Sequence, residues 1–154
     1  MLPSAADTIA LGRRLGQCAL PGLVIALYGR IGAGKTTFVQ GLAQGLGVLH
    51  DTQSPTFTLV AQYDDGRLPL YHLDVYRLGD EAVQEAAMFD DYFYGDGVCA
   101  VEWAQLLHEV LPQDRLDVYF TENPASLLPE PSRAVTVFAH GSISRKAYEQ
   151  WVTA

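Results

Sequence analysis

An apolar run, a glycine-rich loop and a helix-like segment follow one another near the start of the chain, and this order restricts the fold more than any other feature. Residues 23–28 form a continuous apolar run bounded by glycines, which is typical of a strand buried on both faces. After the loop at 29–34, apolar residues recur at helical spacing from Phe38 to Leu46. Strands of this kind occur in parallel sheets covered by helices, so the sequence predicts an α/β domain of three layers around a mostly parallel sheet.

The loop itself matches a phosphate-binding pattern, GxxxxGK[ST], at Gly29, Gly34, Lys35 and Thr36. Glycines let successive backbone N–H groups approach phosphate oxygens, and the start of a helix adds a favourable dipole. We expect Lys35 to reach the β- and γ-phosphates, the Thr36 hydroxyl to bind Mg²⁺, and the N–H of Thr37 to contact the α-phosphate. The sequence thus predicts a P-loop NTPase-like domain that binds a nucleoside triphosphate with Mg²⁺.

Two carboxylates lie where strands are expected to end. Glu102 follows the apolar run at 98–101 as the acid of a Walker B element follows its strand, and this predicts a ligand of the metal or of its waters. Residues 72, 74 and 76 share one face of an alternating segment, so His72, Asp74 and Tyr76 favour a polar site there. The alternatives are a solvated acid for Glu102 and a hydrogen-bonded core or edge histidine for His72.

The rest of the chain is compatible with a single domain over residues 1–154, because we find no internal repeat and no linker long enough to divide it. Two alternating segments flank a turn-forming cluster at 64–67, which predicts an antiparallel hairpin. The patterns predict helices over 4–20, 79–89, 105–110 and 144–152, and strands over 57–63, 68–75, 98–102, 116–121 and 134–139.

Composition restricts the partners and the location. Ten Lys and Arg against 18 Asp and Glu give a net charge of −8, which opposes direct binding to a nucleic-acid backbone. A role on a nucleic acid would therefore pass through a partner protein. No apolar run approaches the roughly 20 residues that span a bilayer, and the first residues lack the basic start of a secretory signal, so we expect a cytoplasmic protein without a membrane anchor.

Four motifs together resemble one protein family. They are GAGKTT at 32–37, SPTFTLV at 54–60, HLDVYRL at 72–78 and VEW at 101–103. In this order they resemble the bacterial TsaE family, also called YjeE. The resemblance implies a small P-loop ATPase, with ATP and Mg²⁺ as its ligands, that works with the TsaB and TsaD proteins in making threonylcarbamoyladenosine beside the tRNA anticodon.

The resemblance also implies roles for individual residues. Thr36 and Glu102 become the magnesium ligands, Lys35 the phosphate lysine and Asp74 a second essential acid. Family members usually carry an acid where this chain has Arg30, so the charge inside the loop is reversed. The implied nucleotide-binding residues are Thr8, Gly32, Ala33, Gly34, Lys35, Thr36, Thr37 and Arg133.

Three further residues are implied to respond to the nucleotide or to a partner. Ser54 and Thr56 flank a proline in a segment that resembles a switch sensing the γ-phosphate. Trp103, next to the metal acid, is expected at the nucleotide or partner face, and its alternative is a plain core tryptophan.

Three functions compete at this stage. The first is an ATPase in which Asp74 or Glu102 orients the attacking water. It would be slow alone and stimulated by a partner, because the order of the motifs provides no arginine finger. The second is a small-molecule kinase, although the cations after Trp103 are too scattered for an arginine-bearing lid. The third is a nucleotide-dependent binding switch that does not require hydrolysis.

Overall fold

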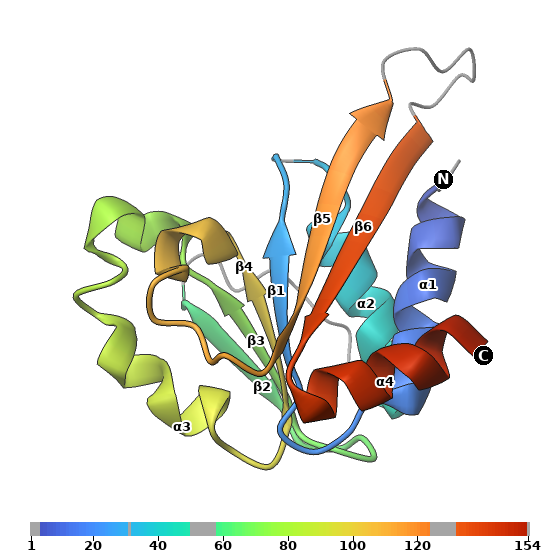
Figure 1. Ribbon diagram of the computed structural model, residues 1–154, viewed down its shortest axis with the longest axis horizontal. Coiled ribbons are helices and arrows are strands. Elements are labelled where there is room, and N and C mark those ends of the chain that lie inside the picture. The colour runs from blue at the N-terminus through green and yellow to red at the C-terminus, as the bar shows by residue number, and fades with distance from the viewer. Residues whose placement is uncertain (1–3, 31, 50–57, 124–131, 154) are drawn as a thin grey trace.

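A six-stranded mixed sheet forms the centre of the molecule, with strand order β2-β3-β4-β1-β5-β6 (Figure 1). The structure is a computed structural model that describes residues 4–30, 32–49, 58–123 and 132–153. The strands β3, β4, β1 and β5 run parallel, whereas β2 and β6 pair antiparallel at the two edges. The strands are β1 (Val24–Tyr28), β2 (Val60–Tyr63), β3 (Leu70–Asp74), β4 (Val98–Glu102), β5 (Arg115–Asn123) and β6 (Ser132–His140).

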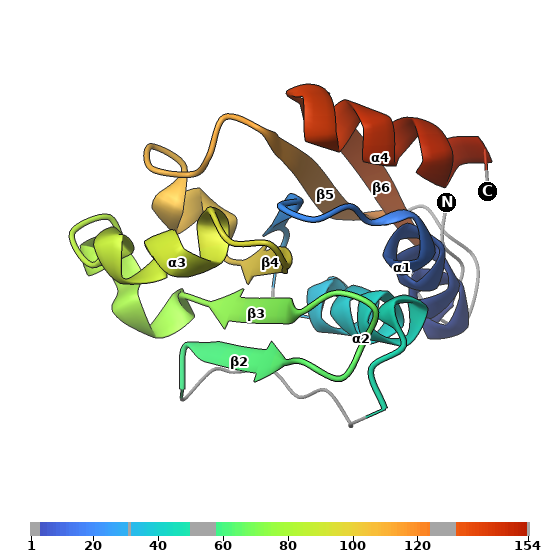
Figure 2. The same ribbon diagram turned by 90° about the horizontal axis from the view of Figure 1, so that it is seen from below.

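Helices cover both faces of this sheet, as Figure 2 shows. On one face lie α1 (Ala5–Cys18), α2 (Lys35–Leu46) and α4 (Ser142–Thr153), and on the other lie α3 (Asp90–Phe93) and the 3₁₀ turns. The strand β1 serves both layers, because Ile25 and Leu27 join the core under α1 and α2 while Val24 and Ala26 join the core on the opposite side. This double burial explains the continuous apolar run at 23–28, and the α/β class with a mostly parallel centre is confirmed.

The strand register brings the predicted acids together. Asp74, the last residue of β3, pairs with Glu102, the last residue of β4, and Leu27 of β1 also pairs with Glu102. Parallel strands end at the same edge of a sheet, so both carboxylates lie beside the loop that leaves β1. The predicted hairpin is confirmed as well, since β2 and β3 pair antiparallel.

The predicted helix over 79–89 is wrong. Gly79 has φ 52° and ψ −134°, which interrupts helical geometry, and the chain forms separate 3₁₀ turns, η1 (Tyr76–Glu81) and η2 (Ala86–Phe89), before α3. The apolar spacing still marked the buried side correctly, since Ala82, Ala86 and Phe89 are all buried. The predicted helix over 105–110 is likewise only a 3₁₀ turn, η3 (Ala104–Leu107).

Glycines bring α1 and α2 into backbone contact, which the sequence analysis did not anticipate. A Cβ atom added at Gly12 would lie 2.2 Å from the carbonyl oxygen of Phe38, and one added at Gly45 would lie 2.1 Å from that of Arg13. Gly16 and Gly41 are equally restricted by opposing backbone. The first helix is thus fitted directly against the helix that begins at the phosphate loop.

We therefore expect Gly41→Ala to destabilise the fold. The new methyl would lie 2.1 Å from the carbonyl oxygen of Ile9, and backbone on both sides must shift to admit it. The expected loss is about 3 kcal/mol in the free energy of unfolding, even though alanine is the better helix former. Urea unfolding measures this loss. Gln17→Ala on the exposed side of α1 is the control, and an unchanged midpoint for Gly41→Ala would contradict the close contact.

Among the described residues, none of the helices combines the length and the apolar character that a membrane crossing requires.

Candidate nucleotide and metal site

The glycine-rich loop joins the end of β1 to the start of α2. Gly32 has φ 78° and Gly34 has φ 110°, a left-handed backbone that favours glycine over any residue with a side chain. Gly34 is the cap of α2, and no side-chain hydrogen bond caps the helix there. The N–H groups at the start of α2 can therefore donate hydrogen bonds to an anion, as a phosphate-binding loop requires.

Lys35 is held at the mouth of this loop. Its ammonium donates a hydrogen bond to the carbonyl oxygen of Gly29 at 2.7 Å and lies 3.9 Å from the ring centroid of Trp103. The residue is only 4% exposed. Burial lowers the pKa of Lys35, while the carboxylates of Glu102 and Asp74 act in the opposite direction. A buried cation beside the loop matches the predicted role of Lys35 at the phosphates.

Thr36 and Glu102 meet across the gap between α2 and β4. The hydroxyl of Thr36 lies 2.9 Å from one carboxylate oxygen of Glu102 and 3.1 Å from the other, so it donates to either. Glu102 is 3% exposed. A hydroxyl and a carboxylate are hard oxygen donors of the kind that Mg²⁺ prefers, and Mg²⁺ takes its other ligands from waters and phosphates.

His72 and Asp74 complete the polar side of the site. The Nε2 atom of His72 lies 2.5 Å from a carboxylate oxygen of Glu102, and His72 is 1% exposed. Asp74 is buried and accepts a hydrogen bond from the backbone N–H of Tyr76 at 3.1 Å. His72 is thus a buried, hydrogen-bonded histidine, as its alternative interpretation held, but its partner is the predicted metal acid. Tyr76 does not share a strand face with His72 and Asp74 as predicted, because β3 ends at Asp74 and Tyr76 begins the turn η1.

Trp103 follows Glu102 in a left-handed backbone conformation, with φ 61° and ψ 37°. Residues other than glycine rarely adopt this conformation, and it turns the chain sharply at the end of β4. The indole contacts the ammonium of Lys35 and also the ring of Tyr76, whose centroid is 4.8 Å away. The contact of Trp103 with Lys35 places its ring at the predicted phosphate site.

This geometry agrees with the family to which the motifs point. The family model described as "Threonylcarbamoyl adenosine biosynthesis protein TsaE" matches residues 2–130. The chain belongs to the TsaE family. It is 52% identical over 112 residues to a protein of Bacillus subtilis strain 168 named tRNA threonylcarbamoyladenosine biosynthesis protein TsaE, with 73% of this chain and 70% of the relative covered.

Other TsaE proteins and a solved structure extend the likeness to nearly the whole chain. The TsaE protein of Treponema pallidum is 41% identical over 142 residues, covering 87% of this chain and 95% of its own. The crystal structure of Bacillus subtilis YdiB superposes with a TM-score of 0.80 at 39% identity, covering 97% of this chain and 90% of the other.

The structure describes some, but not all, of the remaining residues that the TsaE resemblance implied. Thr8 is buried in α1, where its hydroxyl donates to the carbonyl oxygen of Ser4 at 3.4 Å. Thr37 is half-buried in the first turn of α2, and Ala33 is buried in the loop, whereas Arg30 of the same loop is exposed. Ser54, Thr56 and the side chain of Arg133 lie outside the described residues, so their predicted roles stay predictions.

The contact between Trp103 and Lys35 predicts an optical signal for nucleotide binding. A triphosphate would draw the ammonium of Lys35 toward its oxygens and away from the indole. The chain holds two tryptophans, so Trp151→Phe leaves Trp103 as the sole emitter. We expect a saturable change in the fluorescence of this variant on adding ATP and no such change in Trp103→Phe. An unchanged emission, with ATP shown to bind by equilibrium dialysis, would contradict the movement.

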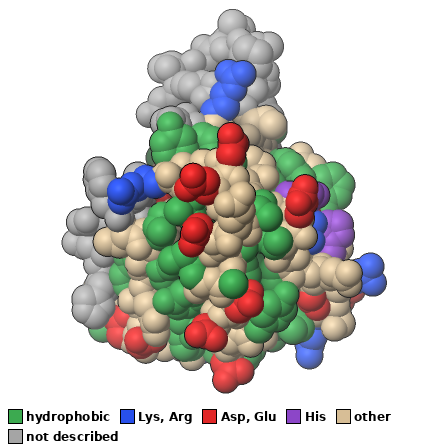
Figure 3. Space-filling view, turned by 90° about the vertical axis from the view of Figure 1, so that its left-hand side faces the viewer, with side chains coloured by type: hydrophobic (Ala, Val, Ile, Leu, Met, Phe, Trp, Pro, Cys, Tyr) green, Lys and Arg blue, Asp and Glu red, His purple; other side chains and the backbone are tan. Residues whose placement is uncertain are grey.

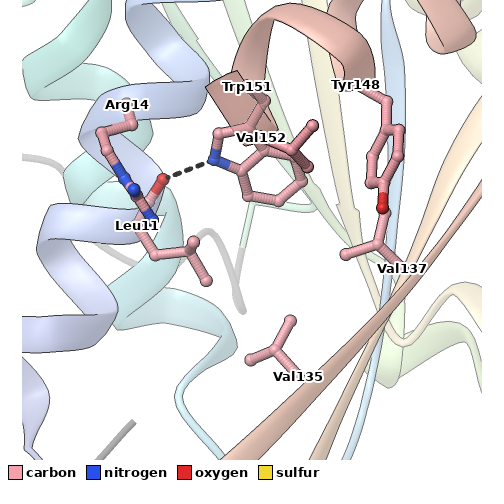
Figure 4. A pocket seen from close by; sticks show the side chains of 7 residues that line it. All are labelled: Leu11, Arg14, Val135, Val137, Tyr148, Trp151 and Val152. Carbon is pink, nitrogen blue, oxygen red and sulfur yellow. Dashed lines mark hydrogen bonds between the residues drawn. The ribbon is translucent and has the colours of Figure 1, made fainter. Parts of the chain in front are cut away.

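A separate cavity of about 440 Å³ lies on the face of the sheet that carries α1, α2 and α4, between α1, α4 and β6 (Figure 4). The indole N–H of Trp151 donates to the carbonyl oxygen of Leu11 at 3.1 Å and fixes one wall. Of the predicted site residues that the structure describes, none lines it. The lining residues are Leu11, Arg14, Val135, Val137, Tyr148, Trp151 and Val152.

Proposed function

We propose that this TsaE-family protein is a P-loop ATPase that depends on Mg²⁺ and serves the threonylcarbamoyladenosine modification of tRNA together with TsaB and TsaD. One observation carries the proposal. The hydroxyl of Thr36 and the carboxylate of Glu102 come from segments 66 residues apart and meet within hydrogen-bond distance beside the glycine loop. This is the pair of oxygen donors that a nucleotide-bound Mg²⁺ needs.

The residues of the site divide the work. Thr36 and Glu102 would hold Mg²⁺, which when bound supplies positive charge against the β- and γ-phosphates. Lys35 would place its ammonium on the same phosphates, and the N–H groups at the start of α2 would donate hydrogen bonds to phosphate oxygens. Catalysis in such a site is mostly positioning and charge stabilisation.

Asp74 is our choice for the residue that orients the attacking water. Glu102 is the proposed metal acid and is bonded to Thr36 and His72, and Asp74 ends the neighbouring strand at the same edge of the sheet. A carboxylate that is 4% exposed and adjacent to the metal acid is suited to accept a hydrogen bond from water.

The charge distribution supports an indirect role on tRNA. Residues 78–114 hold nine of the 18 acidic residues and no lysine or arginine. Figure 3 shows carboxylates spread over the side of the molecule on which α3 lies. Such a surface repels a phosphate backbone. The relatives are named for tRNA threonylcarbamoyladenosine biosynthesis, so we propose that TsaB and TsaD bring the tRNA and stimulate an otherwise slow hydrolysis.

Phosphate release from ATP labelled at the γ-position tests the proposal. We expect labelled inorganic phosphate in the presence of Mg²⁺ and none in the presence of EDTA. Label that accumulates on a small metabolite instead would favour a kinase and contradict the proposal. Phosphate release that is equally fast in EDTA would contradict the dependence on Mg²⁺.

A further inference from the structure

We infer that His72 is a positioning residue for Glu102, donating its Nε2 hydrogen so that the carboxylate stays oriented toward Thr36, the other residue that would hold the metal. The inference rests on the proposed function, because it concerns the metal acid of that site. It assigns a task to a buried polar side chain that the proposed hydrolysis does not otherwise use.

The pairing of the strands β2, β3 and β4 creates this arrangement. His72 lies between Ala61 of β2 and Ala100 of β4 in the register of the sheet, and these small neighbours leave room for an imidazole. Asp74, two residues further along the same strand, pairs with Glu102, so His72 and Glu102 are diagonal neighbours across β3 and β4. The distance between Nε2 and the carboxylate oxygen is 2.5 Å, and each side chain is less than 5% exposed.

Hydrogen-bond directions select His72 as the donor. Thr36 also lies within hydrogen-bond distance of both oxygens of Glu102, and a hydroxyl donating to them requires an acceptor carboxylate. The other ring nitrogen of His72, Nδ1, is buried and has no hydrogen-bond partner among the described residues. A bare lone pair there is less costly than a buried N–H without an acceptor, so a ring hydrogen on Nε2 rather than on Nδ1 is favoured.

This arrangement is costly for a purely structural residue. A buried polar ring with one unsatisfied nitrogen destabilises a core that an apolar side chain of the same volume would fill. Within the described residues, the side-chain hydrogen bond of His72 goes to the acid expected to hold the metal. In known metal sites, removing a hydrogen-bond partner of a ligand weakens metal binding by about 10- to 100-fold.

Two amide substitutions test whether the contact made at Nε2 is needed or whether any polar side chain at position 72 suffices. The side-chain nitrogen of glutamine can take the place of Nε2, whereas the shorter asparagine can only take the place of Nδ1. We expect His72→Gln to keep Mn²⁺ affinity within about threefold of wild type and His72→Asn to weaken it about tenfold or more. Electron paramagnetic resonance of free Mn²⁺, with a non-hydrolysable ATP analogue bound, provides the measurement.

Nucleotide binding in EDTA provides the control for a general structural defect. We expect both variants to bind the analogue without metal as wild type does, within about threefold. Loss of metal-free binding in step with the loss of Mn²⁺ binding would overturn the inference, as would equal Mn²⁺ affinities for His72→Asn and wild type. A wild-type protein that binds Mn²⁺ with the analogue but never hydrolyses ATP would refute the proposed function and leave this inference standing.

The tautomer gives a second measurement that needs neither metal nor nucleotide. The chain has four histidines, and the signal of His72 is the one that disappears in His72→Gln. In ¹⁵N ring spectra we expect a protonated Nε2 and a bare Nδ1 for His72. The opposite tautomer would show that Glu102 receives no hydrogen from this ring and would overturn the inference.

Discussion

Replacing Lys35 by alanine is expected to weaken ATP binding by about 10- to 100-fold. In the proposed site its ammonium binds the phosphates, and it contacts the carbonyl oxygen of Gly29 and the ring of Trp103 beside the loop. A hydrogen bond between charged groups contributes about 1.5–3 kcal/mol, and each 1.4 kcal/mol corresponds to a tenfold change in affinity. Isothermal titration with ATP and Mg²⁺ measures the loss.

The chain offers a close control for this change. Lys146, the only other lysine, is exposed on α4, and Lys146→Ala should leave ATP affinity within about twofold of wild type. The unfolding midpoint of Lys35→Ala should stay close to that of wild type, since burial already disfavours the charge of Lys35 and lowers its pKa. A folded Lys35→Ala protein that binds ATP as tightly as wild type would contradict the proposal that this loop binds the nucleotide.

The second large effect is expected for Glu102→Gln. The amide has one oxygen where the carboxylate has two, and it carries no charge to hold Mg²⁺ beside Thr36. We expect the rate of phosphate release to fall by about 10²- to 10³-fold, because one preorganised electrostatic group is worth about this much in other enzymes. ATP binding in EDTA should be unaffected within about threefold, so the loss should appear only with Mg²⁺ present.

Glu109→Gln, the same change at an exposed position, should hydrolyse ATP at the wild-type rate. Hydrolysis by Glu102→Gln at the wild-type rate would contradict the metal role of Glu102. The same variant distinguishes an ATPase from a binding switch. If protein that binds ATP without hydrolysing it still supports repeated rounds of tRNA modification with TsaB and TsaD, the bound state alone suffices.

The parts of the fold that sequence patterns predict well are those decided by burial. The run at 23–28 is apolar at every position because both faces of β1 are covered, and this alone places a central strand before the loop. Asp74 and Glu102 were each predicted at a strand end, and the parallel pairing of β3 with β4 brings these two ends to one edge of the sheet. The start of α1 also follows a local rule, since the side chain of Ser4 accepts a hydrogen bond from the backbone N–H of Asp7.

The parts that patterns missed depend on distant backbone. Nothing local to Gly12 or Gly41 indicates that each faces a carbonyl oxygen of another helix, because the partner lies about 26 to 32 residues away in the chain. Gly79 was compatible with the start of a helix by spacing, but its backbone conformation ends the regular structure there.

The contacts within the site were also hidden from sequence. Spacing predicted that Lys35 reaches phosphates, but its contacts with Gly29 and Trp103 depend on the left-handed turn after Glu102. The bond between His72 and Glu102 joins residues 30 positions apart and requires the register of β3 against β4. A histidine in an alternating segment carries no local indication of which partner it will meet.

The most direct test of the central claim is phosphate release from ATP and from GTP with Mg²⁺, each with and without the TsaB and TsaD proteins from the same source. We predict slow release from ATP by the protein alone, stimulation when both partners are added, and little response with GTP. Fast release, at about 10 per second or more and indifferent to the partners, would contradict the coupled ATPase. A preference for GTP would contradict the choice of nucleotide.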